Sequence, residues 1–328
     1  MVSYSPVNYK YMKKIVFTAI AAIALFGTGC LKIKEKEVAP DFNVTVDKTT
    51  WAVGSTVTFH LSGNPDYITF FSGEQGLNYA NLNRYNAAGT PKLQFTSARN
   101  AGTQANSLLV LVSSNFAGMG IDSATTAKNI AAATWTDITG RATLATSATA
   151  VASGAIDLSD FPADKPVYIA FRYLATTGAI QNKWTITGLT VTNTLADGSV
   201  YTIANLNSTA ITNYGVATVF SPGWVPFRLN NTANWVVTAG TSLVVTGAAT
   251  AATATVAIDD WAYSGGIVLN KVSNDVGTFV KESSARLASN DYTYTFKTAG
   301  TYVVTFTAAN ASVYGNEEVV KQITLTIQ

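Results

Sequence analysis

The chain has 328 residues, 48% of them hydrophobic and 12% charged, with one cysteine and one histidine. Its 21 Lys and Arg residues against 19 Asp and Glu residues give a net charge of +2, and no basic cluster outside the N-terminus would attract nucleic acid. Single Cys and His residues exclude internal disulfides, Cys/His zinc clusters and Cys₄ iron–sulfur clusters, while the length allows two domains.

Residues 1–29 are predicted to form a secretory signal peptide. Lys13 and Lys14 precede an apolar run over 15–26, which is shorter than the roughly 20 residues that span a bilayer. Small residues follow the run, as at a cleavage site. Translation could start at Met1 or at Met12, since either supplies the same basic and apolar regions.

Cys30 stands directly after those small residues. This arrangement resembles a bacterial lipoprotein lipobox, in the relaxed form of Bacteroidota-type lipoproteins because Gly27 replaces the usual leucine. The resemblance implies that Cys30 is acylated and anchors the mature chain in outer-membrane lipid, with 30–40 as a lipidated tether. The alternative is a plain secreted protein with a free thiol, which is a liability in an oxidising compartment.

From residue 41 onward the pattern predicts an all-β protein. Apolar residues alternate with polar ones at period two, in short runs bounded by Gly, Asn, Asp and Pro, and helical spacing is nearly absent. The Ala-, Thr- and Val-rich stretch 239–258 is also expected to form strands. The clearest runs are Phe42-Val44-Val46, Val57-Phe59-Leu61, Val167-Ile169-Phe171, Ile186-Leu189-Val191, Tyr292-Tyr294-Phe296, Tyr302-Val304-Phe306 and Val320-Ile323-Leu325.

The two ends of this body are expected to form one discontinuous β-sandwich, from 41–77 and 266–328. The run from Tyr294 to Phe306, with its Gly-Thr-Tyr turn, resembles the end of PKD-family domains. Neither end alone has the ~7 strands of an Ig-like sandwich, but the two together do. The alternative is two separate, incomplete Ig-like units.

Residues 78–265 are predicted to form a jelly-roll-like sandwich inserted into the first one, at a loop tip where insertions are tolerated. Segments such as 107–113 and 167–173 resemble extracellular jelly rolls of adhesin-like and carbohydrate-binding proteins. Together with 66–74 and 259–261, they make the mature chain similar to Bacteroidota surface lipoproteins that carry a domain of unknown function. That resemblance implies a link to polysaccharide-utilisation loci.

Residue types that support catalysis are few. His60 follows Phe59 in a strand pattern and is expected to be an exposed strand residue. Glycoside hydrolysis needs two carboxylates across a cleft. The adjacent pairs Glu317-Glu318 and Asp259-Asp260 would point to opposite faces of an extended chain, so no catalytic residue is expected.

No cofactor is expected, although a structural calcium ion is considered. Asp157, Asp160 and Asp164 lie in a loop-rich stretch and could offer the oxygen ligands that calcium prefers. The sequence has no EF-hand spacing, and ordinary Asp-rich turns explain the same pattern.

The predicted ligand site is the segment 221–228, where two prolines and a glycine favour a loop. Trp224 would stack on a sugar ring, and Tyr214, Arg228 and Asn230 would supply neighbouring contacts. The alternative is that Trp224 is buried, as tryptophans usually are. Four other tryptophans lie beside strand patterns and are expected in the core: Trp51, Trp184, Trp235 and Trp261. Trp135 is expected to be intermediate between core and surface.

These features predict a non-enzymatic, lipid-anchored protein of the outer membrane that faces the cell exterior and binds or presents polysaccharide or oligosaccharide. A transporter–lipoprotein complex is an expected partner. Loss of Lys10, Lys13 and Lys14 with the signal leaves 18 basic against 19 acidic residues, a nearly neutral chain that suits an uncharged ligand. The alternatives are an adhesive or fimbria-type surface lipoprotein and a glycoside hydrolase accessory.

Overall fold

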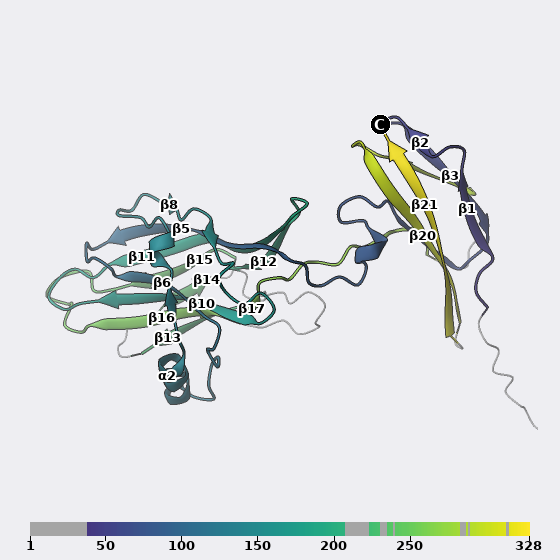
Figure 1. Ribbon diagram of the computed structural model, residues 1–328. Helices are drawn as coiled ribbons and strands as arrows, with labels where there is room; N and C mark the ends of the chain where they lie inside the picture. The colour runs from purple at the N-terminus through teal and green to yellow at the C-terminus, as the bar shows by residue number, and fades with distance from the viewer. Residues whose placement is uncertain are drawn as a thin grey trace, which may run out of the picture. The chain divides into compact units, whose positions relative to one another are not determined.

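The computed structural model describes residues 38–206, 223–229, 235–238, 240–282, 287, 289–312 and 315–328 (Figure 1). The fold is nearly all β, which confirms the predicted fold class. The signal segment and Cys30 lie outside the described residues.

The chain divides into two compact units. The first, the split unit, contains the residues up to Ser72 together with Gly277–Gln328, and the second, the inserted unit, is Gly73–Val276. The boundaries expected from the sequence are 77/78 and 265/266. The inserted unit reaches further at both ends because residues 270–275 hydrogen-bond to 78–87, and because Gln75 Nε2 donates to Ser199 Oγ.

The split unit is a sandwich of two sheets. One sheet has the order β1-β3-β19 and the other β18-β4-β20-β21-β2. All pairs are antiparallel except β2 with β21. The strands are β1 (Phe42–Val46), β2 (Thr50–Trp51), β3 (Thr56–Gly63), β4 (Tyr67–Phe71), β18 (Thr278–Glu282), β19 (Asp291–Thr295), β20 (Gly300–Ser312) and β21 (Gly315–Ile327).

Aromatic side chains fill the core of the split unit. Phe59 of β3 lies 5.2 Å, centroid to centroid, from Phe306 of β20, and Phe70 of β4 lies 5.0 Å from Phe306. The alternation that the sequence shows around Phe59 sets this arrangement, because period two turns Val57, Phe59 and Leu61 inward together. Aromatic pairs at such tilted geometries add about 0.5–1.5 kcal/mol each beyond the area they bury.

The inserted unit is a second sandwich, built from more strands. One sheet has the order β13-β16-β10-β6-β7 and the other β14-β15-β11-β5-β8, with short strands attached at the sides. The strands are β5 (Gly89–Ala101), β6 (Leu108–Ser113), β7 (Thr136–Asp137), β8 (Val151–Ala152), β9 (Ile156–Asp157), β10 (Pro166–Ala175), β11 (Lys183–Leu195), β12 (Val200–Asn205), β13 (Trp224–Arg228), β14 (Trp235–Thr238), β15 (Ser242–Thr246), β16 (Ile258–Ser264) and β17 (Ile267–Val268).

Strand β10 shows how the two faces of its sheet are used. Ile169, Phe171 and Tyr173 point into the main core between the sheets, whereas Ala170 and Arg172 lie on the outer face. Part of that outer face is covered by the helix α2 (Ser123–Ala132), which buries Thr126 and Ile130 (Figure 1).

Two local expectations are wrong. The near absence of helical spacing gave no sign of α2, in which Ile130 is the one large apolar residue. Its N-cap is Asp122, whose side chain accepts a hydrogen bond from Thr125 N at 2.7 Å. The stretch 239–258 is not continuous strand: β15 ends at Thr246, and turns occupy the residues before Ile258. Two 3₁₀ helices also occur, η1 (Tyr79–Asn81) and η2 (Thr139–Arg141).

The two ends of the inserted unit are tied together in a neck, formed by residues 78–87 and 270–275. The carboxylate of Asp275 is buried and accepts hydrogen bonds from Asn78 N at 2.9 Å and Asn81 Nδ2 at 3.2 Å. Arg84 Nη2 lies 3.4 Å from the other oxygen of Asp275. Backbone bonds add to these, including Val272 N to Tyr85 O at 3.2 Å. The neck therefore closes the inserted unit at its own two chain ends.

Candidate functional site

The inserted unit has a groove on the outer face of the β10 sheet, beside α2. Its volume is about 460 Å³, within the range of small-molecule sites. We call it the outer-face groove. Apolar side chains line most of it, with two charged residues, Asp137 and Arg172. The lining residues are Leu109, Leu111, Ala127, Ile130, Ala131, Ala133, Trp135, Asp137, Arg172, Leu229 and Trp261.

Arg172, which lines the groove, is paired with a carboxylate. Arg172 Nε donates to Asp259 Oδ1 at 2.8 Å, and its Nη2 donates to Oδ2 at 2.6 Å. Trp261 Nε1 also donates to Asp259 Oδ1, at 3.0 Å, so one carboxylate fixes both neighbours. The hydrogen bonds that Arg172 donates to Asp259 raise the pKa of the guanidinium, which stays charged at every physiological pH.

Two tryptophans form the aromatic part of the groove. The ring centroids of Trp135 and Trp261 lie 5.1 Å apart at 54°, and the guanidinium carbon of Arg172 lies 5.1 Å from the Trp261 centroid. Trp135 Nε1 donates to Ile130 O at 3.1 Å, which ties this ring to α2. Trp261 is only 3% exposed, whereas Trp135 is half-buried and leaves part of its ring in the groove.

This arrangement suits a ligand with both apolar and hydroxyl surfaces. An exposed aromatic face packs against C–H groups, while a fixed guanidinium and a carboxylate at the rim exchange hydrogen bonds with hydroxyls. Arg172 has 32% of its side chain exposed, and Asp137 is exposed with its Oδ1 accepting from Thr139 N at 2.8 Å. Both charged groups are thus held in place and reachable from solvent.

The predicted site around Trp224 is not a loop, which is a correction. Trp224 begins strand β13, is 1% exposed, and donates from Nε1 to Asn205 O at 3.1 Å. Its ring packs in the main core, 5.9 Å from Phe171, so it presents no face to a ligand. Arg228, at the other end of β13, is exposed. Tyr214 and Asn230 lie outside the described residues.

The remaining tryptophans divide between core and surface. Trp184 and Trp235 belong to the main core of the inserted unit, as expected. Trp261 is buried, but on the outer face of its sheet and not between the sheets. Trp51 is only partly buried, and its Nε1 donates to Lys48 O at 2.9 Å.

The carboxylate pairs do not share a cleft. Asp259 lies on the outer face of its sheet, bonded to Arg172, whereas Asp260 is fully buried on the opposite side of β16. Burial, with the charge of Asp259 as a smaller cause, raises the pKa of Asp260 to about 7. Neither oxygen of Asp260 has a hydrogen-bond partner among the residues that the structure describes. Glu317 and Glu318 are likewise neighbours along one strand, β21.

His60 lies on the surface of the split unit, with 42% of its side chain exposed. Its Nδ1 lies 2.7 Å from Asp291 Oδ1 and its Nε2 3.2 Å from Asp47 Oδ1. The hydrogen bond with Asp291, and then that with Asp47, raises the pKa of His60 above its ordinary value of 6.5.

The acidic residues considered for calcium are used differently. Asp160 receives two hydrogen bonds from Arg141, at 2.9 and 2.7 Å, and these lower the pKa of its carboxyl. Asp157 Oδ1 accepts from Ser159 N at 2.7 Å, as in an ordinary Asp turn. Within the described ranges, no group of three or more His, Cys, Asp or Glu side chains is placed to hold a metal ion.

Arg172, Trp135 and Asp137 are the groove residues that sequence reasoning missed as ligand contacts. Arg172 stands in the middle of the apolar run of β10, where a charge needs a partner, and this was the available signal. Its partner Asp259 is 87 residues away along the chain and meets it only through strand pairing.

The family described as Domain of unknown function (DUF5017) matches residues 30–211, which is more than half of the chain. No curated protein and no solved structure matches this chain. In the part of the chain that the structure describes, no helix is both long and apolar enough to cross a membrane.

Proposed function

We propose, for a chain that belongs to the DUF5017 family, that the mature protein is held on the outer surface of the cell by acylated Cys30 and binds glycan without cleaving it. The observation that carries the binding role is the outer-face groove, in which Trp135 stands beside a fixed arginine–carboxylate pair. The protein would present the glycan to an uptake complex of the transporter–lipoprotein type.

The anchor rests on the sequence before the folded region. Lys13 and Lys14, the apolar run 15–26 and Cys30 have the order of a lipoprotein signal. The family match covers residues 30–211, and its first residue is Cys30. Two or more acyl chains would hold a protein on a membrane stably, where a single chain would not.

The chemistry of the groove supports a sugar ligand. A pyranose ring presents C–H groups on its faces and hydroxyls at its rim, so it needs an aromatic surface and a few polar partners. Trp135 supplies the aromatic surface, and Arg172 and Asp137 supply the polar partners. The guanidinium is already oriented by Asp259, so little conformational entropy would be lost on binding.

A binding role is favoured over hydrolysis by the placement of the carboxylates. Asp259 is engaged by Arg172 and Trp261, and Asp260 faces the interior of the sandwich. A glycosidase needs two carboxyl groups about 5 to 9.5 Å apart with the scissile bond between them. The carboxylates of Asp259 and Asp260 lie on opposite sides of strand β16, so this pair cannot meet that requirement.

Electrophoresis through gels that contain single soluble polysaccharides tests the binding role. We expect at least one neutral plant or microbial polysaccharide to retard the mature protein, and Trp135→Ala to remove the retardation. Trp51→Ala is the matched control, because it removes a partly exposed tryptophan from the split unit and should leave mobility unchanged. Failure of every polysaccharide to retard the wild type would contradict the glycan role and favour the adhesive alternative.

The anchor is tested separately in cells. Metabolic labelling with a palmitate analogue should label the wild type and not Cys30→Ser, and only the wild type should remain with outer membranes after washing at high salt. An unlabelled wild type that is released into the medium would contradict the lipid anchor without affecting the groove.

A further inference from the structure

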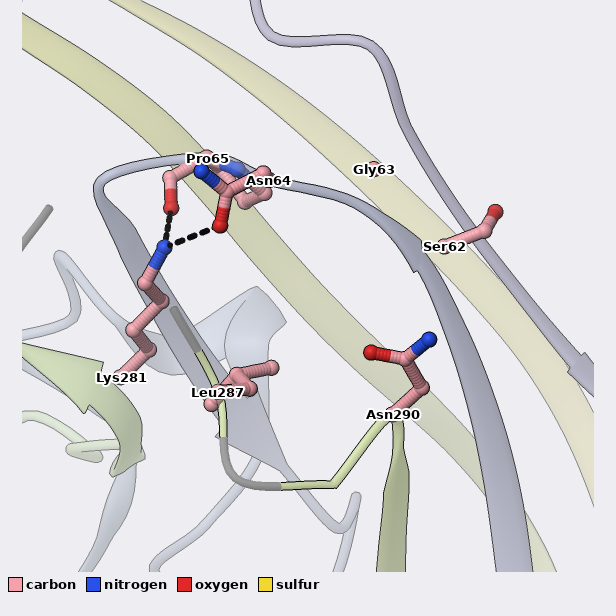
Figure 2. A pocket seen from close by; sticks show the side chains of 7 residues that line it. All are labelled: Ser62, Gly63, Asn64, Pro65, Lys281, Leu287 and Asn290. Atoms are coloured by element: carbon pink, nitrogen blue, oxygen red, sulfur yellow. Dashed lines mark hydrogen bonds between the residues drawn. The ribbon is translucent and has the colours of Figure 1, made fainter. Parts of the chain in front are cut away.

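The split unit contains a cavity of its own, and it shares no lining residue with the outer-face groove of the inserted unit. Its volume is about 420 Å³, and it is lined by the β3–β4 turn, by Lys281 of β18 and by Leu287 and Asn290, which precede β19 (Figure 2). The lining residues are Ser62, Gly63, Asn64, Pro65, Lys281, Leu287 and Asn290.

Lys281 is a buried cation at the wall of this cavity. Its side chain is 5% exposed, and its ammonium donates to Asn64 Oδ1 at 2.9 Å and to the carbonyl oxygen of Pro65 (Figure 2). An ammonium has three N–H donors, so these two neutral acceptors leave one donor unused among the described residues.

No carboxylate compensates this charge in the described parts of the chain. None of their ion pairs includes Lys281. The sequence also has no acidic residue at positions 283–288, directly after β18. A buried charge without a counter-charge is costly, and proteins ordinarily pair it or neutralise it.

An irregularity in strand β18 turns the side chain of Lys281 into the unit, although a lysine in this strand would ordinarily face solvent. The pairing of β18 with β4 shifts register between Phe279 and Lys281, so that Val280 is an extra, bulged residue. As a result Phe279 is 64% exposed while Lys281 is buried. Simple alternation would put these two residues on one face, and bulges are a known means of redirecting a side chain. Such a break with local polarity is expected at a functional site.

From this combination we propose that the cavity binds a small organic anion, of monosaccharide size, whose carboxylate or sulfate group accepts from Lys281. The anion supplies the missing charge and the missing acceptor. Asn290 offers a polar group for its hydroxyls (Figure 2), and the volume lies within the range of small-molecule sites. The proposal does not depend on the outer-face groove, which is in the inserted unit.

Calorimetric titration of the mature protein tests the proposal with three probes: sodium glucuronate, glucose as its neutral counterpart, and sodium sulfate. We expect glucuronate or sulfate to bind with a millimolar or lower Kd, and glucose to bind at least tenfold more weakly. Binding of glucuronate identifies a carboxylate ligand, and binding of sulfate alone identifies a sulfate group. Binding of neither anion, or equal binding of glucose, would overturn the proposal.

Two variants locate the site. Lys281→Met should weaken anion binding at least tenfold, whereas Lys297→Met, which removes an exposed lysine from the same unit, should not. Asn290→Trp should also abolish binding by filling the cavity, and it keeps Lys281 in place if the first variant fails to fold. Undiminished anion binding by a folded Lys281→Met or by Asn290→Trp would place the anion elsewhere and overturn the proposal.

Discussion

Arg172 of β10 lies directly opposite Trp261 of β16, yet it forms its two hydrogen bonds with Asp259, two residues away on the same strand. Period two puts Asp259 and Trp261 on one face of β16, so a single arginine contacts both. This diagonal contact turns the guanidinium along the outer face of the sheet and gives the groove its fixed polar centre.

Replacement of Asp259 by asparagine should therefore disturb the groove more than the fold. The amide cannot accept both guanidinium hydrogen bonds, so Arg172 loses its orientation, and we expect glycan affinity to fall about tenfold. Because Arg172 is about one-third exposed, the free energy of unfolding should drop by less than about 2 kcal/mol. Calorimetry and urea unfolding measure the two effects, with Asp164→Asn as the exposed control. Unchanged affinity would show that Asp259 does not position the site.

The neck should depend on Asp275. Asp275→Ala leaves Asn78 N and the side chain of Asn81 without their acceptor and removes the buried partner of Arg84. We expect the free energy of unfolding to fall by about 2–3 kcal/mol, measured by urea unfolding with tryptophan fluorescence. Asp197→Ala, at an exposed turn, is the control and should change it by less than about 1 kcal/mol. A neck variant as stable as this control would contradict the assignment.

Burial of Asp260 should make stability depend on pH. Its folded pKa of about 7 lies above the ordinary value of 3.8, so the folded state holds the proton more tightly. Its contribution to stability is complete below pH 3.8 and is lost as the pH rises through 7. Relative to the wild type, Asp260→Asn should gain up to about 4 kcal/mol between pH 4 and pH 8. A difference in unfolding free energy that stays constant over this range would refute burial of the ionisable group.

Titration of His60 should likewise make the split unit less stable as the pH rises. Because Asp291 and Asp47 raise its pKa above 6.5, the charged imidazole stabilises the fold below pH 6.5, and this contribution disappears as the pH rises through the raised value. In His60→Gln that part of the pH dependence should be lost. Thermal unfolding at pH 5.5 and pH 8.5 compares the two proteins. An identical pH dependence in both would mean that His60 does not titrate differently on folding.

Alternation made much of the fold predictable, as around Phe59 and Phe171, because burial of one sheet face imposes period two on the sequence. The segment around Trp224 was predicted to be a loop because it contains two prolines and a glycine, among them Pro226. Strand β13 is the edge of its described sheet, where a residue without an N–H costs no ladder bond. Local signals thus set strand identity well, but not which strand becomes an edge.

The groove could not be predicted in the same way. Arg172, Asp259 and Trp135 come from segments far apart in the chain, and pairing of β10 with β16 and packing of α2 bring them together. The position of Lys281 was also unpredictable, since a lysine two residues after Phe279 looks exposed unless the bulge at Val280 is known. Both sites arise from contacts and irregularities that a single sequence does not encode locally.

Calorimetric titration with a purified oligosaccharide is the decisive measurement for glycan binding in the outer-face groove. The ligand is an oligosaccharide prepared from the polysaccharide that retards the protein most, and the proteins are the wild type, Trp135→Ala and Trp51→Ala. If the groove binds glycan, Trp135→Ala raises Kd at least tenfold, about 1.4 kcal/mol, while Trp51→Ala matches the wild type. Equal affinity of a folded Trp135→Ala and the wild type would contradict glycan binding there.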